Sequence, residues 1–546
     1  MTSDPHKLIM ALQDPAVWPD CPERVELVET HISWVFLTRD FAWKIKKPVE
    51  FDFLDFSTLK LRKQFCDEEL QLNRRTAPEL YLGVVPICGT VAAPKIDGTG
   101  EPIEFAVKMR RFDDAGLLSR MAMEKRLTPA LIDNLAETIA EFHGTIRQAR
   151  TESDYGRPRY IQQDALDNFV AIEQRANGDE LHEAAVRHLK AWTIAEGLRL
   201  TAILTRRREN GFVRECHGDL HLRNIVEIDG RPCLFDCLEF NARFRWVDVI
   251  SEVAFLVMDL EEHGEERFAR RLLNRYLERT GDYGGLKVLR FYLVYRAMVR
   301  AKVDMIRLRD RTQSAAQRRV FLNEFGEYVS IADHDAQRTQ APLLIMHGLS
   351  GSGKTAVSQR IVEESHTISV RSDIERKRLH GIAETDRVSG AATDRLYSPH
   401  ATRRTYSHLA SLATTVIEAG FPVIVDATFL QAEERAQFRE LARKLGVPFR
   451  IIACAASEEE LLARVSARSA DDQDASDAGV AVLRKQLLIE TDLKQEPVDE
   501  LIIVDTTNET SVKEVLKRVL DQPERLASIA TNLDNRSTAA CRTDTD

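Results

Sequence analysis

The sequence predicts an α+β domain followed by an α/β domain built on a parallel sheet. Its 546 residues exceed the ~250 to 300 at which a single hydrophobic core stops growing, so the chain should divide. In the first part, strand-like stretches precede helical ones, which is the α+β order. In the second part, short apolar runs alternate with helical segments. This pattern is typical of a parallel sheet covered on both faces.

Composition sets broad limits on function. With 44% hydrophobic and 30% charged residues, the chain has the balance of a globular protein in water. A formal net charge of -10 gives no field that would collect nucleic acid, so we expect no stable nucleic-acid complex. No apolar run is long enough to span a membrane, and the N-terminus lacks a signal-like pattern. Because the 8 cysteines are scattered, we expect reduced thiols and a cytoplasmic location.

The first part begins with predicted strands. Residues 31–54 alternate or run apolar as strands do, and residues 57–76 have helical spacing with Ser57 as the expected N-cap. Further strands are expected within 81–94 and 103–112. From about 128 to 210 the pattern turns helical, and a later helix over 265–281 should end at Gly281. These elements form the expected α+β domain.

A change in amino-acid composition marks the predicted domain boundary. Residues 331–342 are polar and end at Pro342, which is typical of a linker. We therefore expect one domain over 1–335 and a second over 336–525. Residues 526–546 show no periodicity and are expected to be a disordered tail.

A phosphate-binding motif opens the second domain. Residues 348–355, GLSGSGKT, match G-x-x-x-x-G-K-[ST] and lie between a predicted strand and a predicted helix. Backbone N–H groups of such a turn surround phosphates, the lysine contacts the β and γ oxygens, and the final hydroxyl can ligate Mg²⁺. The alternative is a glycine-rich turn without a ligand. The expected nucleotide-binding residues are Gly348, Ser350, Gly351, Ser352, Gly353, Lys354 and Thr355, with Lys354 also acting in catalysis and Thr355 also holding the metal.

Other residues of this domain are placed to act on an acceptor. Asp373 and Arg376 share one face of a predicted first helical turn, where the carboxylate could accept a proton and the arginine could hold an anion. Their alternative is an N-cap with surface basic residues. Asp426 ends the predicted strand over 422–428 and could hold Mg²⁺. Arg464 and Arg468 precede an acidic stretch suited to a mobile lid, although they could equally be helix-surface residues.

On these motifs, residues 342–522 resemble the small P-loop kinases that include gluconate kinase, polynucleotide kinase and zeta-toxin-like proteins. The resemblance implies ATP-dependent phosphorylation of a hydroxyl on a small molecule, nucleotide or polynucleotide. It assigns ATP binding to Lys354 and Thr355. By analogy with the D-x-x-R pattern of polynucleotide kinases, it assigns the catalytic base to Asp373 and substrate binding to Arg376.

The stretch HGDLHLRN, residues 217–224, is the second motif that carries chemistry. A zinc site is disfavoured because tetrahedral sites usually draw ligands from two separated segments. Phosphoryl transfer fits better, with Asp219 accepting the hydroxyl proton, Asn224 ligating Mg²⁺, and Asp236 holding the metal that bridges the phosphates.

The spacing H-G-D-x-H-x-x-N, followed by a strand and Asp236, resembles the aminoglycoside phosphotransferase and choline kinase family, which is related to protein kinases. The resemblance covers about 25–330 and implies a protein-kinase-like fold. It also implies a strand lysine on the ATP phosphates, Lys44 or Lys46, with an acidic helical partner, Glu68 or Glu69. Spacing does not decide within either pair.

Three further features complete this comparison. Residues 107–112 could form a hinge beside adenine or an ordinary strand. Glu239 lies in a charged stretch that lines the acceptor pocket or packs the lobe in that family, and we expect it near the acceptor. The chain departs from related kinases because residues 25–45 contain no G-x-G-x-x-G, which weakens the expectation of nucleotide affinity.

Together, the two parts resemble a bacterial fusion of an aminoglycoside phosphotransferase-like domain with a P-loop ATPase or kinase domain. The expected function is a bifunctional phosphotransferase that uses ATP and Mg²⁺. The alternative is a P-loop NTPase regulated by a nucleotide-binding pseudokinase domain, with no phosphorylated acceptor. The acceptors and the oligomeric state do not follow from the sequence.

Overall fold

A computed structural model describes residues 5–51, 54–174, 180–308, 313–337, 341–384, 386, 388, 391–468 and 480–520. The chain forms two compact units. Unit 1 consists of Met1–Glu265 and Phe291–Ala336, and unit 2 consists of Glu266–Arg290 and Gln337–Asp546. The predicted tail, 526–546, lies outside the described residues.

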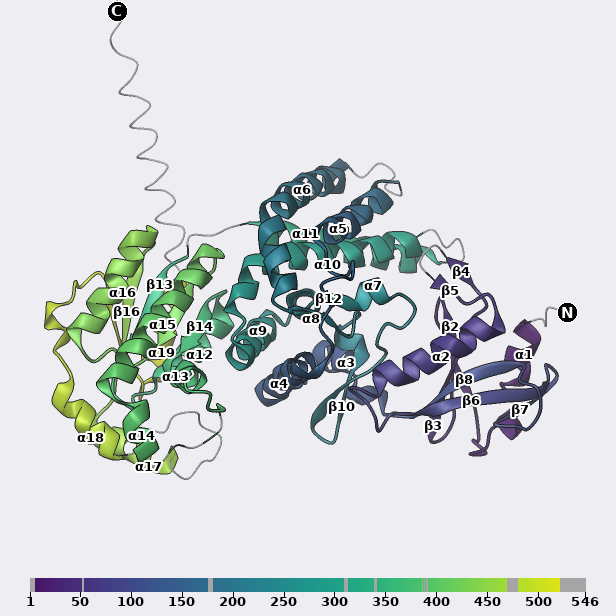
Figure 1. The fold of residues 1–546 in the computed structure, drawn as a ribbon, viewed down its shortest axis with the longest axis horizontal. Coiled ribbons are helices and arrows are strands. Elements are labelled where there is room, and N and C mark those ends of the chain that lie inside the picture. The colour runs from purple at the N-terminus through teal and green to yellow at the C-terminus, as the bar shows by residue number, and fades with distance from the viewer. Residues whose placement is uncertain are drawn as a thin grey trace, which may run out of the picture. The chain divides into compact units, whose positions relative to one another are not determined.

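Unit 1 begins with an antiparallel sheet (Figure 1). Its strand order is β1 (Glu26–Glu29), β2 (Ser33–Leu37), β3 (Phe41–Lys46), β8 (Glu104–Arg110), β6 (Tyr81–Thr90) and β7 (Ala93–Ile96). Side chains alternate between the faces of a strand. Accordingly, Trp43 and Ile45 of β3 are buried in one cluster with Trp18 and residues of α1 (Pro5–Ala11). Lys44 and Lys46 therefore project from the opposite face.

Helix α2 (Leu59–Asn73) packs on β6 and β8. The helix predicted over 57–76 is confirmed, but Ser57 is not its N-cap. Thr58 takes that position, and its side-chain oxygen accepts a hydrogen bond from the Leu61 N–H at 3.2 Å. The Ser57 hydroxyl instead donates to Asp55 at 2.6 Å. Both residues suit a cap, so the local pattern did not distinguish them.

The rest of unit 1 is mainly helical, as predicted for 128–210. The helices are α3 (Leu118–Met123), α4 (Pro129–Thr145), α5 (Pro158–Glu173), α6 (Glu180–Glu209), α7 (Ala242–Arg245), α8 (Val249–Glu262), the later part of α10 (Leu286–Arg307) and α11 (Ala315–Ala336). Two short antiparallel pairs lie among them. They are β9 (Val213–Glu215) with β12 (Trp246–Asp248), and β10 (Ile225–Ile228) with β11 (Arg231–Leu234).

The linker predicted over 331–342 is partly wrong. Helix α11 continues to Ala336, and Tyr328, Val329, Ala332 and Ala336 are buried along it. This spacing of three to four residues is the apolar stripe of a packed helix. The stripe was concealed because its last members are alanines among polar residues. Residues 338–340 lie outside the described residues.

Unit 2 contains the predicted parallel sheet, in the order β14-β15-β13-β16-β17. The strands are β13 (Leu343–His347), β14 (Ile368–Arg371), β15 (Val423–Asp426), β16 (Phe449–Ala455) and β17 (Leu501–Asp505). The helices that follow residue 337 are α12 (Lys354–Glu364), α13 (Ser372–Leu379), α14 (Ala391–Leu396), α15 (Pro399–Glu418), α16 (Ala432–Leu445), α17 (Glu458–Arg468), α18 (Val480–Ile489) and α19 (Glu509–Leu520). Chain order reverses at β13, and ligands of such sheets bind beyond the carboxyl ends of strands at this switch point.

Helices cover both faces of this sheet. On one face, buried residues of α12 and α19 join apolar strand residues in a single cluster. On the other face, Tyr406 of α15, Phe429, and Phe438 of α16 make edge-to-face ring contacts. The three-layer α/β architecture predicted for this part is confirmed.

A segment from the middle of the chain also belongs to unit 2. It contains α9 (Glu266–Thr280), a short turn over Tyr283–Gly285 and the start of α10. Helix α9 packs on α12 and β14, and it ends at Gly281, as predicted. The Gly281 φ is +73°, and its N–H donates to the Leu277 carbonyl at 2.8 Å.

This segment caps the free edge of β14. Asn274 donates to the Thr367 carbonyl at 3.3 Å and accepts from the Ser369 N–H at 2.7 Å. The Tyr283 hydroxyl donates to the Ser369 carbonyl at 3.3 Å. An edge strand presents unpaired backbone groups that must be covered or kept in water. Asn274 and Tyr283 cover them here.

In the described residues, we find no helix with the length and apolar character that crossing a membrane requires.

We predict that Asn274→Ala loosens the edge of unit 2. The change removes the partners of the Ser369 N–H and the Thr367 carbonyl, at a cost of about 1 to 3 kcal/mol. Hydrogen exchange should show amides of 366–371 exchanging faster by about tenfold or more. Asn134→Ala, at an exposed position of α4, is the matched control. Unchanged exchange at 366–371 in Asn274→Ala would contradict this role.

Candidate active sites

The loop over 217–224 is fixed by buried contacts on both sides. His217 hydrogen-bonds the Phe235 carbonyl through Nε2 at 2.8 Å, and the Gly218 N–H donates to Glu252 at 2.7 Å. The Leu222 N–H donates to Asp259 at 2.8 Å. Gly218 has a φ of +89°, and a Cβ there would lie 3.0 Å from the Phe244 carbonyl oxygen and from the Arg245 Cβ. The loop therefore requires glycine at 218 and holds its polar side chains in place.

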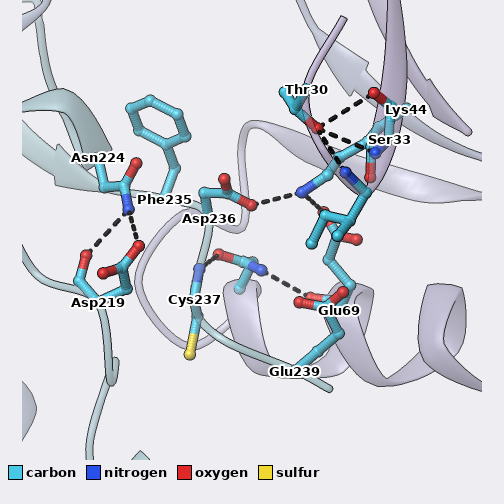
Figure 2. A network of polar contacts seen from close by, with 12 residues as sticks. Thr30, Ser33, Lys44, Glu69, Asp219, Asn224, Phe235, Asp236, Cys237 and Glu239 are labelled. Atoms are coloured by element: carbon cyan, nitrogen blue, oxygen red, sulfur yellow. Dashed lines mark hydrogen bonds and ion pairs between the residues drawn. The ribbon is translucent and has the colours of Figure 1, made fainter. Parts of the chain in front are cut away.

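Asp219 and Asn224 meet within this loop (Figure 2). The Asn224 amide donates to the Asp219 carbonyl at 2.9 Å and to its carboxylate at 3.2 Å. His221 Nε2 lies 3.4 Å from the same carboxylate. Burial raises the pKa of Asp219, but the charge and hydrogen bond of His221 outweigh burial and hold it below the usual value. Asp219 is thus an ionised carboxylate at neutral pH. His217 faces Phe235 instead, so the two histidines do not converge as a zinc site requires.

The two candidate lysines both bind Glu69. Lys44 Nζ lies 2.9 Å from one Glu69 oxygen, and Lys46 Nζ lies 2.7 Å from the other. Burial lowers the pKa of Lys44, but the carboxylates of Asp236 and Glu69 raise it well above its usual value. Burial also lowers the pKa of Lys46, but Glu239 and Glu69 raise it above its usual value, so both lysines are charged. From the two pairs that the resemblance left open, the structure brings together both lysines and Glu69.

The lysines differ in their other partner. Lys44 Nζ lies 2.5 Å from Asp236 Oδ1, whose side chain is 43% exposed. Lys46 is fully buried and pairs with Glu239, which is also buried. Lys44 thus faces the open side of the site, whereas Lys46 and Glu239 form an internal pair. This contact places Glu239 in the lysine network, not on an exposed wall that an acceptor would meet.

Glu68 belongs to a different network. Its carboxylate binds Arg245 at 2.5 Å, and Arg245 also contacts Glu215 at 3.2 Å. Arg245 donates to the Glu239 carbonyl at 3.0 Å as well. Glu69, and not Glu68, is therefore the helix carboxylate that contacts the β3 lysines.

Asp236 sits on a strained turn two residues beyond β11. Its φ is +62°, a value that is uncommon outside glycine. Its N–H donates to the Tyr81 hydroxyl at 3.1 Å, and the Cys237 N–H donates to Asn73 at 2.8 Å. The Phe235 N–H donates to the Asn224 carbonyl at 3.0 Å, which ties this turn to the 217–224 loop. Figure 2 shows Asp236 between Lys44 and the Asp219–Asn224 pair.

The predicted hinge begins as strand and continues past it. Within 107–112, residues up to Arg110 belong to β8, and Phe112 follows the strand. The Phe112 ring lies 5.1 Å from that of Phe235, beside Asp236. Residues 107–110 are thus an ordinary strand, and the hinge beside adenine stays a prediction.

The tight turn between β1 and β2 spans only residues 30–32. The β1–β2 turn is too short for a long glycine-rich loop.

The P-loop of unit 2 lies at the switch point after β13. Gly348, Gly351 and Gly353 have φ values of +143°, +85° and +85°. A Cβ at Gly348 would lie 2.7 Å from the Cys454 carbonyl. Lys354 Nζ donates to the carbonyls of Gly348 and Leu349, each at 2.8 Å. The loop therefore wraps back over its own lysine.

Thr355 and Asp426 are joined beside this loop. The Thr355 hydroxyl donates to Asp426 Oδ2 at 2.8 Å. Burial raises the pKa of Asp426, although Arg371 and Lys354 oppose the shift. The two predicted metal ligands of this unit are thus in direct contact.

Residues of α17 and α18 also contact the loop. The Ser350 N–H donates to Gln486 of α18 at 2.8 Å, while Ser350 and Ser352 are buried. Arg464 donates to the Gly351 carbonyl at 3.4 Å and to the Thr506 hydroxyl at 3.1 Å. The side chain of Arg468 and the predicted lid, 469–479, lie outside the described residues. Gln486 and Thr506 were missed, since no motif surrounds them.

The predicted acceptor residues of unit 2 differ in placement. Asp373 lies in the first turn of α13 and is partly exposed. Arg376 is buried, donates to the Leu396 carbonyl at 3.1 Å and stacks on Tyr397. Arg376 also donates to the Thr402 hydroxyl at 3.4 Å, so its described contacts join α13 to the end of α14 and to α15. Sequence reasoning missed Arg371, which pairs in register with Asp426 at the carboxyl ends of β14 and β15. Its position just before Asp373 was the available signal.

We predict that Lys46→Met destabilises unit 1 more than Lys44→Met does. Lys46→Met leaves Glu239 buried without its cation, which costs about 3 kcal/mol or more. Lys44→Met leaves Glu69 paired with Lys46 and Asp236 partly in water, so the cost should be about 1 kcal/mol.

Tryptophan fluorescence during urea unfolding can test this, because all five tryptophans lie in unit 1. Lys60→Met, at an exposed position of α2, is the control. Equal unfolding midpoints for Lys44→Met and Lys46→Met would contradict the prediction, because the two lysines would then stabilise unit 1 equally.

Comparisons with known proteins find two family regions in the chain, of which the first includes the α9 segment of unit 2. Residues 59–291 match the model of the phosphotransferase enzyme family, and residues 343–488 match that of the AAA domain. Uncharacterized proteins of Mycobacterium bovis and Mycobacterium tuberculosis are 29% identical to this chain over 456 residues, which is 83% of this chain and 88% of theirs.

Two solved structures illustrate the two parts. Amicoumacin kinase, in complex with AMP-PNP and Ca²⁺, matches 59% of this chain and 93% of its own, with 15% identity and a TM-score of 0.39. A gluconokinase from Sinorhizobium meliloti 1021 matches 37% of this chain and 99% of its own, with 24% identity and a TM-score of 0.24. The chain therefore combines a region similar to the phosphotransferase enzyme family with a region similar to the AAA domain, in the order that the sequence predicted.

Proposed function

We propose that the chain is a bifunctional phosphotransferase whose two units each move the γ-phosphoryl group of ATP to a hydroxyl of an acceptor. In each transfer, a bond forms between the acceptor oxygen and the γ-phosphorus while the bond to the β-phosphate oxygen breaks. The acceptor proton passes to a carboxylate, and ADP leaves. Catalysis of this kind depends on positioning and on fixed charges that offset the phosphate charge.

In unit 1, Asp219 is the proposed base. It is held by Asn224 and lies near His221, and its lowered pKa keeps it ready to accept a hydrogen bond from an alcohol. Lys44 is the proposed phosphate-binding lysine, because it faces the partly exposed Asp236, whereas Lys46 is sealed between Glu69 and Glu239. Lys46 is then a positioning residue that holds Glu69 against Lys44.

In unit 2, Lys354 and the backbone N–H groups of 348–355 are the proposed phosphate ligands. The contacts of Lys354 with the Gly348 and Leu349 carbonyls would be exchanged for phosphate oxygens when ATP binds. Asp373 is the proposed base, since it begins α13 at the same end of the sheet as Asp426. Arg464 contacts the loop backbone and would add positive charge there.

Both sites have donors suited to Mg²⁺, which prefers oxygen ligands and usually retains substrate phosphates and water around it. Asn224 and Asp236 would hold it in unit 1, and Thr355 with Asp426 in unit 2. When bound, Mg²⁺ neutralises part of the phosphate charge. The direct contact of Thr355 with the buried Asp426 supports this donor set.

The observation that supports the proposal most strongly is Lys44 held between Glu69 and Asp236. Carboxylates from two segments that are distant in sequence, α2 and the turn after β11, converge on that ammonium group, at 2.9 and 2.5 Å. A lysine needs no such arrangement for fold stability alone, since buried ion pairs rarely exceed well-packed apolar residues in stability. The NTPase alternative has no comparable observation in its favour.

We predict that Asp219→Asn and Lys354→Ala each abolish one of two transfer activities. Full-length variants would be incubated with γ-labelled ATP, Mg²⁺ and a panel of metabolites and oligonucleotides. A product lost with Asp219→Asn by about 100-fold or more, but kept with Lys354→Ala, belongs to unit 1. The converse result assigns a product to unit 2.

Matched controls are Asp229→Asn, in the exposed β10–β11 turn, and Lys485→Ala, on the exposed side of α18. Both should leave every product unchanged. Label found only in free phosphate would refute transfer to an acceptor and favour the NTPase. Products that survive Asp219→Asn and Lys354→Ala alike would reject both assignments.

A further inference from the structure

A group of charged side chains connects α9 to the carboxyl end of β14. Glu278 of α9 is buried, and its carboxylate lies 3.4 Å from Arg275 and 3.8 Å from Arg371. Arg378 of α13 donates to the Glu278 carbonyl. Arg275 also binds Glu384 at 2.6 Å. Through Glu278, a helix from the middle of the chain therefore contacts Arg371, the last residue of β14.

Arg371 lies beside residues of the proposed P-loop site. It is the register partner of Asp426, and partners in adjacent strands project from the same face. Asp426 in turn binds Thr355 of the P-loop. Asp373 follows two residues later, at the start of α13. Arg371 is thus a guanidinium beside the proposed metal ligand and the proposed base.

Carboxylates of α9 and of the proposed P-loop site both lie near Arg371. Burial lowers its pKa, but Glu278, Asp426, Asp373 and Glu384 raise it above the usual value. Its side chain is 19% exposed, whereas that of Glu278 is 8% exposed. At 3.8 Å, the pair with Glu278 is too long for a direct hydrogen bond. The guanidinium is therefore oriented by Glu278 without being fully bound by it.

We propose that Arg371 is a catalytic residue of the P-loop site, contacting oxygens of the transferring phosphate, and that Glu278 is the residue that positions it. The inference rests on the proposed function of unit 2. It adds that this site is incomplete without α9, a helix that ends at Thr280, before the P-loop in the sequence and within the part that matches the phosphotransferase family. An arginine so placed adds positive charge where negative charge develops in the transition state.

The test uses full-length protein carrying Asp219→Asn, so that the unit 1 reaction is removed. Release of labelled phosphate from γ-labelled Mg-ATP is measured, with water as acceptor. Loss of this release in Lys354→Ala first establishes that it comes from the P-loop site. If Lys354→Ala leaves the release unchanged, the proposed function of unit 2 fails, and that failure is separate from the tests of Arg371.

With that established, Arg371→Gln should lower kcat by about tenfold or more while KM for ATP changes by less than about threefold. Glu278→Gln should lower kcat in the same way by a smaller factor, roughly three- to tenfold. In an Arg371→Gln background, Glu278→Gln should have no further effect, because residues that act through one another are not additive. Arg371→Lys, which keeps the charge, should recover part of the rate.

Arg271→Gln is the matched control, because Arg271 anchors the other end of α9 to buried Glu363 at 2.5 Å. It should leave kcat within about twofold of the parent. The proposal is overturned if Arg371→Gln keeps the parental kcat, or if Glu278→Gln lowers kcat by the same factor with and without Arg371. It is also overturned if Arg271→Gln lowers kcat as much as Glu278→Gln, since the effect would then be the seating of α9.

Discussion

The buried carboxylate of Glu69 is the constraint on which unit 1 depends. It binds two lysines of β3 at once, and Asp236 and Glu239 supply the further negative charge that keeps both lysines protonated at that depth. Through Lys44 the same carboxylate fixes the distance between the sheet and Asp236. The alternation of β3 makes this possible, because Trp43 and Ile45 fill the core on the opposite face. A stable sheet and a charged site thus share one strand.

Unit 2 brings its charged side chains together in a different way. Here the strands are parallel, so their carboxyl ends lie at one edge and bring Asp426 and Arg371 together by register. The proposed phosphate-binding groups are mostly backbone N–H groups, and glycine at 348 is required by the nearby Cys454 carbonyl. This is why the P-loop motif is compact in sequence, whereas the unit 1 site draws on β3, α2 and two separate loops.

That contrast explains what could be predicted from the sequence. Both fold classes and the P-loop followed from periodicity and a contiguous motif. Choosing Glu69 over Glu68 required knowledge of how α2 is rotated on the sheet, since Arg245, from a segment far along the chain, takes Glu68. Arg376 matched a local pattern, yet α14 covers it. Arg371 and Glu278 could not be paired, because 93 positions separate them and only the packing of α9 brings them together.

The position of α9 also changes how the chain should be divided. A cut near residue 336 follows the linker-like sequence, but it would remove Asn274 and Tyr283 from the edge of β14 and Glu278 from Arg371. The exposed strand would then present the unpaired N–H and C=O groups that favour aggregation. Because α10 begins in unit 2 and continues into unit 1, no single cut separates the two units intact. Each proposed activity is therefore best measured in the full chain with point substitutions, since a truncated P-loop fragment would lose activity for reasons unrelated to its own chemistry.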